Sequence, residues 1–437
     1  MNLKIYIKTF GCKVNQYDSE LIKENLNIDP NFKLVNNYFD ADLFIINSCF
    51  VTEKAENEVI KEVKKLSKLG KVIITGCFNK TLNMDNVYFL NLKNRLKIRE
   101  FIYGIFDMKV EGKIYKNKIE NFSNRTRAFV KVEEGCDKFC SYCIVPYLRG
   151  RAKSRDIEEV VDEVKMLIEN GYKEIVLTGT ELGYFGLERG ESIVTLLKKL
   201  ISINKNFRIR LSSIDPEFLS DDIIYLMRDN DKICPHIHLP LQSGSDRILE
   251  KMRRRYNVSY YLERVNFFKK NVKNGTITTD IIVGFPYEEY EDFEKTVEIL
   301  KEVKFLKCHI FPYSRREGTL AATYDCKIDK NIVIDRLKII NDIANKIRKE
   351  VIESFNNKEF ILLTENKKDG KLYGFTENYI RVYIDDKFDR NNFYKIYLQT
   401  TKNNVEYGIV LNEFYYSTIE GGEIKECQQF IEEKAKI

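Results

Sequence analysis

The stretch Gly135-Cys-Asp-Lys-Phe-Cys-Ser-Tyr-Cys143 places Cys136, Cys140 and Cys143 on one short loop. It follows Phe129-Val-Lys-Val132, a run that is typical of a strand. Three thiolates this close can bind three irons of a cubane cluster and leave the fourth iron open to react. A structural zinc site is the alternative. It normally needs a fourth Cys or His nearby, and the three histidines of the chain are far away in sequence.

The same strand begins a regular alternation of strands and helices. We predict strands at 128–133, 173–178, 207–212, 236–241, 277–283 and 305–311. Each but the last is followed by a helical segment; Ser154 or Asp156 can cap the helix at 156–170, and Gly171 suits its end. Six strands in this order predict an α/β fold with an open or partial (β/α)6 barrel over residues 122–355.

The amino-terminal part also alternates. Strands are predicted at 3–9, 43–47 and 71–75, and helices at 18–26 and 54–69. Short apolar strands between amphipathic helices predict a parallel sheet covered by helices. We place this parallel α/β domain at residues 1–117.

One cysteine closes each of these three strands, namely Cys12, Cys49 and Cys77. The carboxyl ends of neighbouring parallel strands share one edge of the sheet, where open α/β folds place ligands. The three thiolates could therefore meet there and hold a second cluster. The alternative is that each is a small buried residue, since free cysteine is often buried. Three such cysteines, each beside Gly or Ser, favour the cluster.

The last part of the chain changes character. A long helix at 329–355 precedes strand-like runs at 360–363, 379–384 and 394–398, which are separated by Gly, Asn and Asp turns. This pattern predicts a small β-barrel, which we place at residues 357–420. The tail after Leu411 has no pattern that predicts a structure.

Composition limits the remaining possibilities. A chain of 437 residues, 43% of them hydrophobic, can form about three domains. No apolar run approaches the roughly 18 residues that cross a bilayer, and the start lacks a signal sequence, so we expect a cytoplasmic protein without a membrane partner. Thiols stay reduced there, so the ten cysteines indicate metal or redox chemistry rather than disulfides. A net charge of +6 alone does not establish a polyanionic partner.

The cysteine spacing, its place after the first barrel strand, and Tyr142 before the last cysteine resemble the radical S-adenosylmethionine superfamily. The resemblance implies a 4Fe-4S cluster on Cys136, Cys140 and Cys143, whose open iron is chelated by the methionine part of S-adenosylmethionine. It also implies that an electron from the cluster cleaves this cofactor to a radical that abstracts hydrogen from carbon. The protein would orient and shield that chemistry.

Within this superfamily the chain resembles the methylthiotransferases over about residues 1–411. The motifs that carry the likeness are Thr9–Glu20, Ile46–Cys49, Thr75–Cys77 and Gly135–Arg155, and residues 357–411 resemble the RNA-binding TRAM barrel of that family. The resemblance implies an auxiliary 4Fe-4S cluster on Cys12, Cys49 and Cys77.

Further motifs look most like the MtaB branch of the family: Phe10–Gln16, Leu211–Pro216, Cys234–Ser245, Arg253–Tyr256 and His309–Ser314. That branch converts N6-threonylcarbamoyladenosine at position 37 of tRNA, beside the anticodon, to its 2-methylthio derivative. The resemblance implies that one S-adenosylmethionine methylates sulfur held at the auxiliary cluster, and that another yields the radical that activates adenine C2. It also implies an electron donor and a sulfur source, which the sequence does not identify; nor does the sequence fix the oligomeric state.

Two turns are weaker signals. Thr178-Gly-Thr-Glu-Leu-Gly183 ends the second barrel strand, where family members bind the methionine part of the cofactor. We therefore predict Gly179 and Glu181, with Tyr142, as cofactor contacts, although a plain tight turn explains the glycine equally well. In Gly284-Phe-Pro-Tyr-Glu288, Tyr287 stands where the family usually has glycine, so a positive φ there would be strained.

Other polar groups receive simpler interpretations. His236 and His238 alternate onto one strand face, and we expect hydrogen-bonded packing inside the barrel rather than metal binding. The cysteines without partners at ligand spacing are interpreted as structural or incidental: Cys234, Cys308, Cys326 and Cys427.

Basic and aromatic groups suggest RNA. The predicted phosphate contacts are Arg149, Arg151, Lys153, Arg155, the run at 251–255, Arg315 and Arg316, and the predicted base-stacking residues, if exposed, are Tyr379, Tyr383 and Tyr397. Four other functions remain open at this point. They are the same chemistry on an aspartate of a small-subunit ribosomal protein, the same chemistry on isopentenyladenosine of tRNA, a zinc-containing RNA-binding protein, and an iron–sulfur electron carrier.

Overall fold

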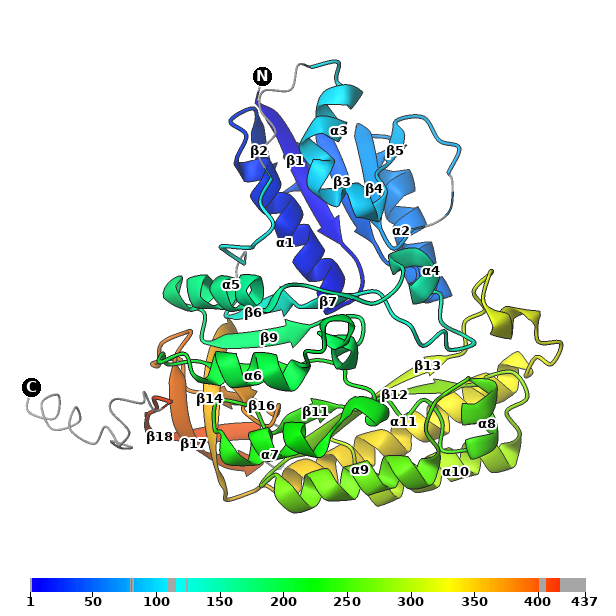
Figure 1. Cartoon of the computed structure of the whole chain (residues 1–437), viewed down its shortest axis with the longest axis vertical. Coiled ribbons are helices and arrows are strands. Elements are labelled where there is room, and N and C mark those ends of the chain that lie inside the picture. The colour runs from blue at the N-terminus through cyan, green and yellow to red at the C-terminus, as the bar shows by residue number, and fades with distance from the viewer. Residues whose placement is uncertain are drawn as a thin grey trace, which may run out of the picture.

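The structure is a computed structural model that describes residues 2–78, 80, 82–108, 115–122, 125–400 and 406–416. Figure 1 shows an amino-terminal sheet at the top, a central layer of strands and helices, and a small carboxy-terminal barrel at the lower left. Among the described residues, no helix has the length and apolar character needed to cross a membrane. The end of the chain beyond residue 416, which includes Cys427, lies outside the described residues.

The amino-terminal sheet has five parallel strands in the order β2-β1-β3-β4-β5. They are β1 (Leu3–Thr9), β2 (Phe32–Val35), β3 (Leu43–Ser48), β4 (Lys71–Gly76) and β5 (Val87–Phe89). Every residue of β3 is buried, as expected for a central parallel strand that is covered on both faces. The sequence does not predict β2 or β5, because four and three residues of mixed polarity give no periodic signal.

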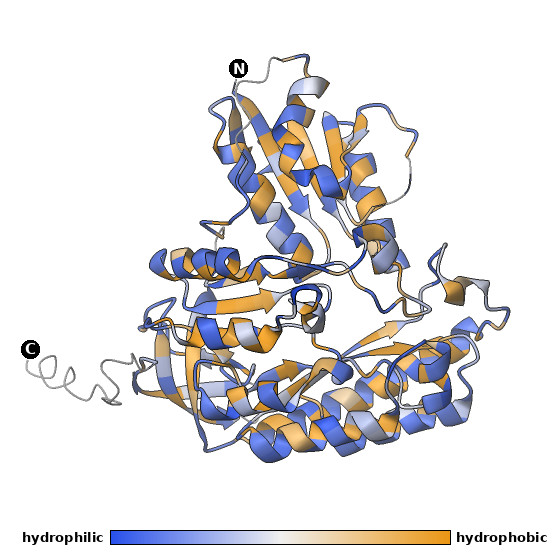
Figure 2. Cartoon of the chain, in the orientation of Figure 1, coloured by the Kyte–Doolittle hydropathy of each residue, from blue (hydrophilic) through white to orange (hydrophobic). Residues whose placement is uncertain are grey.

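Three helices accompany this sheet (Figure 1). They are α1 (Lys13–Asn27), α2 (Glu53–Leu66) and α3 (Ile98–Ile105). The Thr52 side chain caps α2 by accepting from the Ala55 amide. The first helix begins at Lys13 rather than at residue 18, so it starts directly after Cys12. Figure 2 shows the strands largely apolar and the outer helices with polar faces toward solvent.

The central part contains all six predicted strands, in two parallel sheets of order β10-β9-β6 and β11-β12-β13. They are β6 (Arg127–Lys131), β9 (Glu174–Thr178), β10 (Arg208–Leu211), β11 (His236–His238), β12 (Thr276–Val283) and β13 (Lys307–Pro312). Isolated parallel bridges, Ile209 with Ile233 and Ser213 with His238, join the two sheets. Since β6 and β13 do not pair in the described structure, the barrel is partial and open, as predicted.

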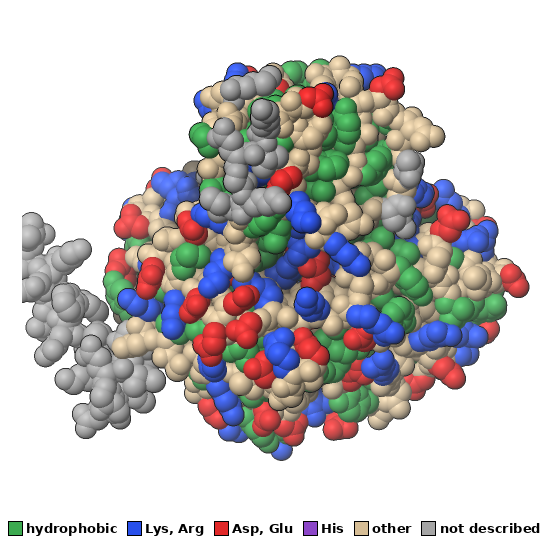
Figure 3. All heavy atoms as spheres, turned by 45° about the horizontal axis from the view of Figure 1, so that its top comes forward, with side chains coloured by type: hydrophobic (Ala, Val, Ile, Leu, Met, Phe, Trp, Pro, Cys, Tyr) green, Lys and Arg blue, Asp and Glu red, His purple; other side chains and the backbone are tan. Residues whose placement is uncertain are grey.

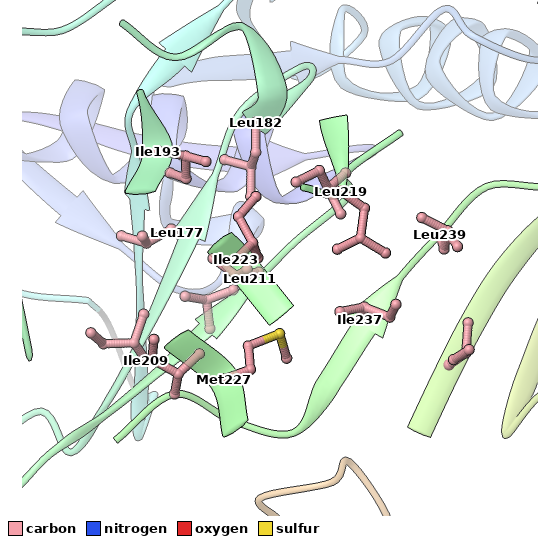
Figure 4. Close-up of a cluster of buried hydrophobic side chains, with 14 of the residues drawn as sticks. Leu177, Leu182, Ile193, Ile209, Leu211, Leu219, Ile223, Met227, Ile237 and Leu239 are labelled. Carbon is pink, nitrogen blue, oxygen red and sulfur yellow. The ribbon is translucent and has the colours of Figure 1, made fainter. Parts of the chain in front are cut away.

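Helices surround this partial barrel (Figure 1). They are α4 (Val145–Arg149), α5 (Ile157–Glu169), α6 (Ile193–Ile201), α7 (Asp221–Asp229), α8 (Asp246–Lys251), α9 (Val258–Asn271), α10 (Tyr290–Val303) and α11 (Lys330–Glu353). Figure 4 shows Leu177 and Leu211 of the strands beside Ile193 of α6 and Ile223 and Met227 of α7, all in one buried cluster. This apolar layer gives the loops at the carboxyl ends of the strands a rigid support.

The carboxy-terminal part is a closed five-stranded barrel of order β14-β15-β16-β18-β17, which confirms the predicted small β-barrel. Its strands are β14 (Glu359–Lys368), β15 (Lys371–Thr376), β16 (Arg381–Ile384), β17 (Phe393–Thr400) and β18 (Glu406–Glu413). The sequence does not predict β15 or β18. The last four residues of the predicted barrel range, 417–420, lie outside the described residues.

A buried ion triad joins this barrel to the core. Glu174 at the start of β9 accepts from Arg208 Nε at 2.7 Å and from Arg210 Nε at 2.8 Å. The Arg208 terminal nitrogens also donate to the carbonyls of Ile361 and Phe375 in the small barrel, at 3.0 and 2.9 Å. The small barrel therefore covers the amino ends of the core strands and leaves their carboxyl ends for a functional site.

Candidate cluster and cofactor site

The loop that carries Cys136, Cys140 and Cys143 leaves the core after β6, through the short strand β7 (Glu133–Glu134). Gly135 has φ +93°, and a β-carbon there would lie 2.0 Å from the Arg151 carbonyl oxygen, so only glycine fits. Burial, reinforced by the neighbouring thiols of the loop, raises the pKa of Cys136 and Cys143 to about 12. Cysteine binds a metal as the thiolate, so thiols this basic would release their protons to solvent when a cluster binds.

The second triad assembles at one edge of the amino-terminal sheet. Cys12, Cys49 and Cys77 follow β1, β3 and β4, which are neighbours in that sheet. Gly11 has φ +95°, and a β-carbon there would lie 2.9 Å from Cys49 Sγ. Burial raises the pKa of Cys77 to about 11, and Cys12 and Cys49 act in the same direction. The structure thus brings together the three thiols that the strand order predicts.

The two triads face each other across the boundary between the amino-terminal sheet and the core. Burial is the main cause of the raised pKa of Cys143, and the Cys77 thiol of the other triad raises this pKa further. These two thiols are therefore close enough to interact electrostatically. The helix α4 follows Cys143 and ends at Arg149, whose Nε donates to Cys77 Sγ at 3.1 Å. Two cluster positions would therefore lie side by side.

Neither triad has the spacing of a single metal ion. Three thiolates on one zinc must lie within about 4.6 Å of one another, twice the Zn–S bond of about 2.3 Å. In the described part of the chain, the group whose ligand atoms all lie within 4.8 Å of one another is His238, Asp280 and His309, which contains no cysteine. Neither cysteine triad meets that distance criterion, and the wider spacing is compatible with a cluster that binds each thiolate through a different iron.

In each triad, one thiol accepts a hydrogen bond from a buried arginine side chain. Arg149 donates to Cys77, and a terminal nitrogen of Arg254 donates to Cys140 Sγ at 3.1 Å. Arg254 also pairs with the buried carboxylate of Asp215. The expectation that Arg149 and Arg254 contact RNA phosphates is wrong, because both guanidiniums are enclosed by protein and hydrogen-bonded there.

The turn after β9 packs against the cysteine loop. A β-carbon at Gly179 would lie 2.8 Å from Glu133 Oε2, so the glycine lets this carboxylate approach the turn. Glu133 Oε2 accepts from the Glu181 amide at 2.9 Å, while Glu181 Oε1 accepts from the amides of Gly183 and Asp215 at 3.1 and 3.0 Å. Burial raises the pKa of Glu181 to about 7, opposed by Lys138 and reinforced by Asp215.

Several buried polar atoms beside this turn have no hydrogen-bond partner among the described residues. They are Glu133 Oε1, Tyr184 OH, Ser212 Oγ and Asp215 Oδ1. Unpaired buried acceptors and hydroxyls are costly unless a ligand completes them. An ammonium and a carboxylate, the two groups of the methionine part of S-adenosylmethionine, are suited to such a set. The residues present therefore fit this cofactor.

Tyr142 and Tyr287 line the next part of the loop layer. The Tyr142 ring packs edge-on to Phe285, with centroids 6.4 Å apart. Tyr287 adopts φ +70°, the conformation for which glycine is usual, and the expected strain is therefore present. Its ring contacts offset that strain: Lys251 Nζ lies 4.5 Å from the ring centroid, and the Tyr324 ring lies 5.7 Å away.

The barrel histidines are hydrogen-bonded, as predicted. Thr278 Oγ1 lies 3.1 Å from His236 Nε2 and 2.9 Å from His238 Nδ1. The sequence interpretation misses Asp280, which lies 3.2 Å from His238 Nε2 and 3.1 Å from His309 Nδ1. Residues 238, 280 and 309 lie on three strands that the sequence predicts. That these strands are neighbours, with the three side chains side by side, is known only from their pairing in the fold.

Lys13 is a further residue that the motif analysis does not single out. It follows Cys12 directly, and its ammonium has no hydrogen bond or ion pair with any residue that the structure describes. Burial is the main cause of the lowered pKa of Lys13. Tyr379 raises this pKa, whereas Arg127 and Arg210 lower it further. These three residues belong to β6, β10 and the small barrel, so Lys13 points into the core barrel.

The predicted RNA contacts divide into two groups. The basic residues at the surface are Arg151, Lys153, Arg253, Arg255 and Arg315. Arg155 instead pairs with Glu163 at 2.5 Å, and Arg316 with Glu56 at 2.7 Å, so the prediction is wrong for both. Figure 3 shows Lys and Arg side chains gathered along the junction below the amino-terminal sheet, with acidic groups among them.

The three tyrosines predicted to stack on bases lie in different surroundings. The Tyr379 ring lies against the core, 4.6 Å from the His236 ring and 4.7 Å from the Arg210 guanidinium. The prediction that a base stacks on Tyr379 is therefore wrong. Tyr383 and Tyr397 are half-buried on the small barrel. The Arg381 guanidinium lies 4.1 Å from the Tyr373 ring centroid and 5.1 Å from the Tyr383 ring centroid, and the two rings are 5.9 Å apart.

Comparison with known proteins places this site in a class. The radical SAM superfamily model matches residues 130–300, and the model of uncharacterized protein family UPF0004 matches residues 4–89. A solved structure of the radical S-adenosylmethionine methyltransferase TsrM from Kitasatospora setae shares the fold, with a TM-score of 0.51 and 13% identity over 70% of this chain and 72% of that one. The fold and the cysteine loop thus define a radical S-adenosylmethionine protein.

Relatives narrow the class. The chain is 37% identical to threonylcarbamoyladenosine tRNA methylthiotransferase MtaB of Aquifex aeolicus, over 87% of this chain and 96% of the relative. It is 33% identical to MtaB of Bacillus subtilis, over 86% and 88%, and 35% identical to tRNA-2-methylthio-N(6)-dimethylallyladenosine synthase of Acetivibrio thermocellus, over 85% and 83%. The chain belongs to the MtaB-type family of radical S-adenosylmethionine tRNA methylthiotransferases.

Proposed function

We propose that this chain attaches a methylthio group to C2 of N6-threonylcarbamoyladenosine at position 37 of tRNA. When bound, a 4Fe-4S cluster on Cys136, Cys140 and Cys143, an auxiliary 4Fe-4S cluster and S-adenosylmethionine supply the radical and the methylthio group. The auxiliary cluster belongs on the triad of the amino-terminal sheet, Cys12, Cys49 and Cys77. The chain itself holds these groups, excludes water and orients the nucleoside.

The observation that carries this proposal is the facing of two cysteine triads from two separate sheets. A radical enzyme that only abstracts hydrogen needs one such triad, whereas sulfur insertion needs a second place that holds sulfur. Arg149 joins the two places, since it follows Cys143 by six residues and donates to Cys77 at 3.1 Å. An electron carrier would not need the unpaired polar atoms beside the cysteine loop.

Lys13 supports the choice of nucleoside. The relatives are named for two different adenosines, one with a threonylcarbamoyl group and one with a dimethylallyl group. The first group ends in a carboxylate and the second is apolar. Among the described residues, the Lys13 ammonium has no ion-pair partner, and Glu174 acts on it only from a distance. A buried ammonium in this position, one residue from Cys12, favours an anionic group near the auxiliary site. Lys13 would bind the threonyl carboxylate.

Glu181, Gly179 and Tyr142 are the residues proposed to form the S-adenosylmethionine site, Glu181 and Tyr142 by direct contact. Glu181 Oε2 lies 3.7 Å from Lys138 Nζ, so its carboxylate already stands beside a cation. A cofactor ammonium could take a comparable position. The Tyr142 ring provides an apolar wall next to Cys143, with Phe285 behind it. Gly179 acts indirectly, by letting Glu133 approach.

The small barrel is proposed as a TRAM-like RNA-binding unit. Its Arg381 guanidinium lies beside the rings of Tyr373 and Tyr383, and such a group of one cation and two aromatic rings is of the kind that binds bases and phosphates. Next to it, a hollow of about 140 Å³ between core and barrel is lined by Arg125 and Tyr373, among others. Arg125 is exposed and can contact a phosphate.

We place the reaction in the cytoplasm, where tRNA is found and thiols stay reduced. The reaction also needs an electron donor and a source of sulfur, which are separate partners of this chain.

The experiment that tests the proposal is mass spectrometry of tRNA nucleosides from cells with and without the gene. The deletion is complemented with the wild type and with Cys140→Ala. We expect the 2-methylthio derivative of threonylcarbamoyladenosine to disappear on deletion and to return only with the wild type. If the 2-methylthio derivative of dimethylallyladenosine disappears instead, the substrate is dimethylallyladenosine and not threonylcarbamoyladenosine. An unchanged nucleoside profile would contradict a tRNA substrate and direct attention to ribosomal protein.

A further inference from the structure

Every polar contact of the Arg149 guanidinium is made inside the boundary between the amino-terminal sheet and the core. Nε donates to Cys77 Sγ at 3.1 Å, and one terminal nitrogen donates to Asn15 Oδ1 at 2.5 Å. The other terminal nitrogen donates to Asp18 Oδ2 at 3.1 Å and to Glu134 Oε1 at 2.7 Å. The guanidinium that contacts the sulfur is thus also held by oxygen atoms of Asn15, Asp18 and Glu134.

The guanidinium is enclosed by protein, and its contacts span both parts of the site. The exposed fraction of the Arg149 side chain is 3%, and that of Asp18 is 1%. Asn15 and Asp18 lie on α1 and Cys77 follows β4, all in the amino-terminal part, whereas Glu134 directly precedes the cysteine loop of the core. The group that touches one triad is therefore carried by the helix that follows the other.

We propose that Arg149 is a positioning residue of the auxiliary site, which holds the Cys77 sulfur as a cluster ligand and raises the reduction potential of the cluster bound there. Hydrogen bonds to ligand sulfur and nearby positive charge favour the more negative, reduced state of an iron–sulfur cluster. The low dielectric of a buried site strengthens both effects. The inference rests on the auxiliary cluster of the proposed function and names the side chain that sets its potential.

Arg95 provides a matched control in the same network. Its Nε lies 3.3 Å from Asp18 Oδ1 and a terminal nitrogen lies 2.7 Å from Glu134 Oε2, so it contacts the same two carboxylates as Arg149. In the part of the chain that the structure describes, no hydrogen bond joins Arg95 to a cysteine. Arg95→Gln removes one charge from the network and leaves the bond to sulfur in place.

The test uses the full-length chain with Cys136→Ala, Cys140→Ala and Cys143→Ala, so that only the auxiliary site can be loaded. This parent, its Arg149→Gln variant and its Arg95→Gln variant are reconstituted with iron and sulfide. Iron and sulfide per chain are counted, and the midpoint potential is read from a redox titration followed by electron paramagnetic resonance. We expect one cluster in the parent, a more negative potential in Arg149→Gln, and a clearly smaller shift in Arg95→Gln.

Equal shifts in the two variants, or none in Arg149→Gln, would overturn the proposal. If Arg149→Gln does not load a cluster, Arg149→Lys retains the charge, and arginine labelled with nitrogen-15 reports the contact directly. A nitrogen hyperfine coupling to the reduced cluster, present in the parent and absent in Arg149→Lys, supports the proposal, and its absence from the parent overturns it. A parent that binds no cluster would instead remove the auxiliary site itself, and with it the proposed function.

Discussion

The backbone of Gly11 lies against the side chain of Cys49, so close that a β-carbon at residue 11 would be 2.6 Å from Cys49 Cβ and 2.9 Å from its sulfur. Gly11 also has φ +95°, which L side chains rarely adopt. The loop after β1 can therefore pass beside the end of β3 only as glycine. This contact brings Cys12 and Cys49 to one place at the edge of the sheet.

Gly11→Ala is expected to remove the auxiliary cluster and leave the other. The added methyl group must push the Cys49 side chain away, while residues 136–143 are untouched. Iron and sulfide per reconstituted chain should fall by half. Gly190→Ala is the control, because Gly190 has φ +69° but open space around its β position, so it carries the backbone strain without the clash. Full iron content in Gly11→Ala would contradict the assigned role of this contact.

Glu174→Gln is expected to lower the free energy of unfolding by about 3–5 kcal/mol, the usual cost of leaving a buried charge unpaired. Glu174 is the carboxylate that both Arg208 and Arg210 contact, and all three side chains are fully buried. Denaturant unfolding measures the loss. Asp229→Asn removes one partner of an exposed pair with Arg228 and should change the same quantity by less than about 0.5 kcal/mol. Similar values for the two variants would mean that the triad contributes little.

Tyr287→Gly should be more stable than Tyr287→Ala by about 1 kcal/mol, because both variants lose the ring and differ only in how well they tolerate positive φ. Tyr287 has φ +70° in the structure. Thermal unfolding of the two variants side by side gives the difference. If alanine is the more stable of the two, the loop does not hold positive φ at this residue.

The affinity for S-adenosylmethionine should fall as the pH is lowered through about 7. Burial raises the pKa of Glu181 to about 7, so its carboxylate is ionised above that pH and protonated below it. An ionised Glu181 attracts the cofactor ammonium, and protonation removes that attraction, by about tenfold at one pH unit below the pKa. Calorimetric titrations at pH 8 and pH 6 measure this change.

Glu181→Gln isolates the effect, since glutamine still accepts from the amides of Gly183 and Asp215 but carries no charge. It should bind the cofactor more weakly at pH 8 and show a flatter pH dependence than the wild type. Parallel pH dependences in the two proteins would assign the titration to the cofactor and not to Glu181.

Lys13→Met should reduce kcat/KM for tRNA with threonylcarbamoyladenosine by about 10- to 100-fold, the range expected for one lost charge-assisted hydrogen bond. Lys13→Arg keeps the charge and should retain most of the activity. The matched substrate is tRNA with dimethylallyladenosine, on which Lys13→Met should not lose activity relative to the wild type. An equal loss on both substrates would make Lys13 a structural residue.

The sequence predicted the parts of this fold that repeat. All six core strands and the first, third and fourth strands of the amino-terminal sheet carry runs of apolar β-forming residues between turn residues, and these runs are visible without a structure. The short strands β2 and β5 are stabilised by pairing with their neighbours and not by their own composition, so no local pattern marks them. The sequence singles out Cys136, Cys140 and Cys143 by their spacing on one loop, and Cys12, Cys49 and Cys77 because strand order determines which loops meet.

Charged side chains were predicted less well, because their roles depend on what surrounds them. A run such as Arg149 to Arg155 looks like a basic surface, yet Arg149 is buried against Asp18, and the half-buried Arg155 pairs with Glu163. Tyr379 was expected to stack on a base and lies instead on His236, more than a hundred residues away in sequence. Long-range packing decides these cases, and sequence spacing contains no record of it.

The most direct test of the central claim is mass spectrometry of a purified reaction. The wild type, Cys77→Ala and Cys140→Ala are reconstituted and given reductant, S-adenosylmethionine and a tRNA anticodon stem-loop that contains threonylcarbamoyladenosine. The account predicts a 2-methylthio product with the wild type, no product with either variant, and cleavage of S-adenosylmethionine by Cys77→Ala but not by Cys140→Ala. Methylthiolation by Cys77→Ala equal to that of the wild type would contradict the account, because the two facing triads would then not act together.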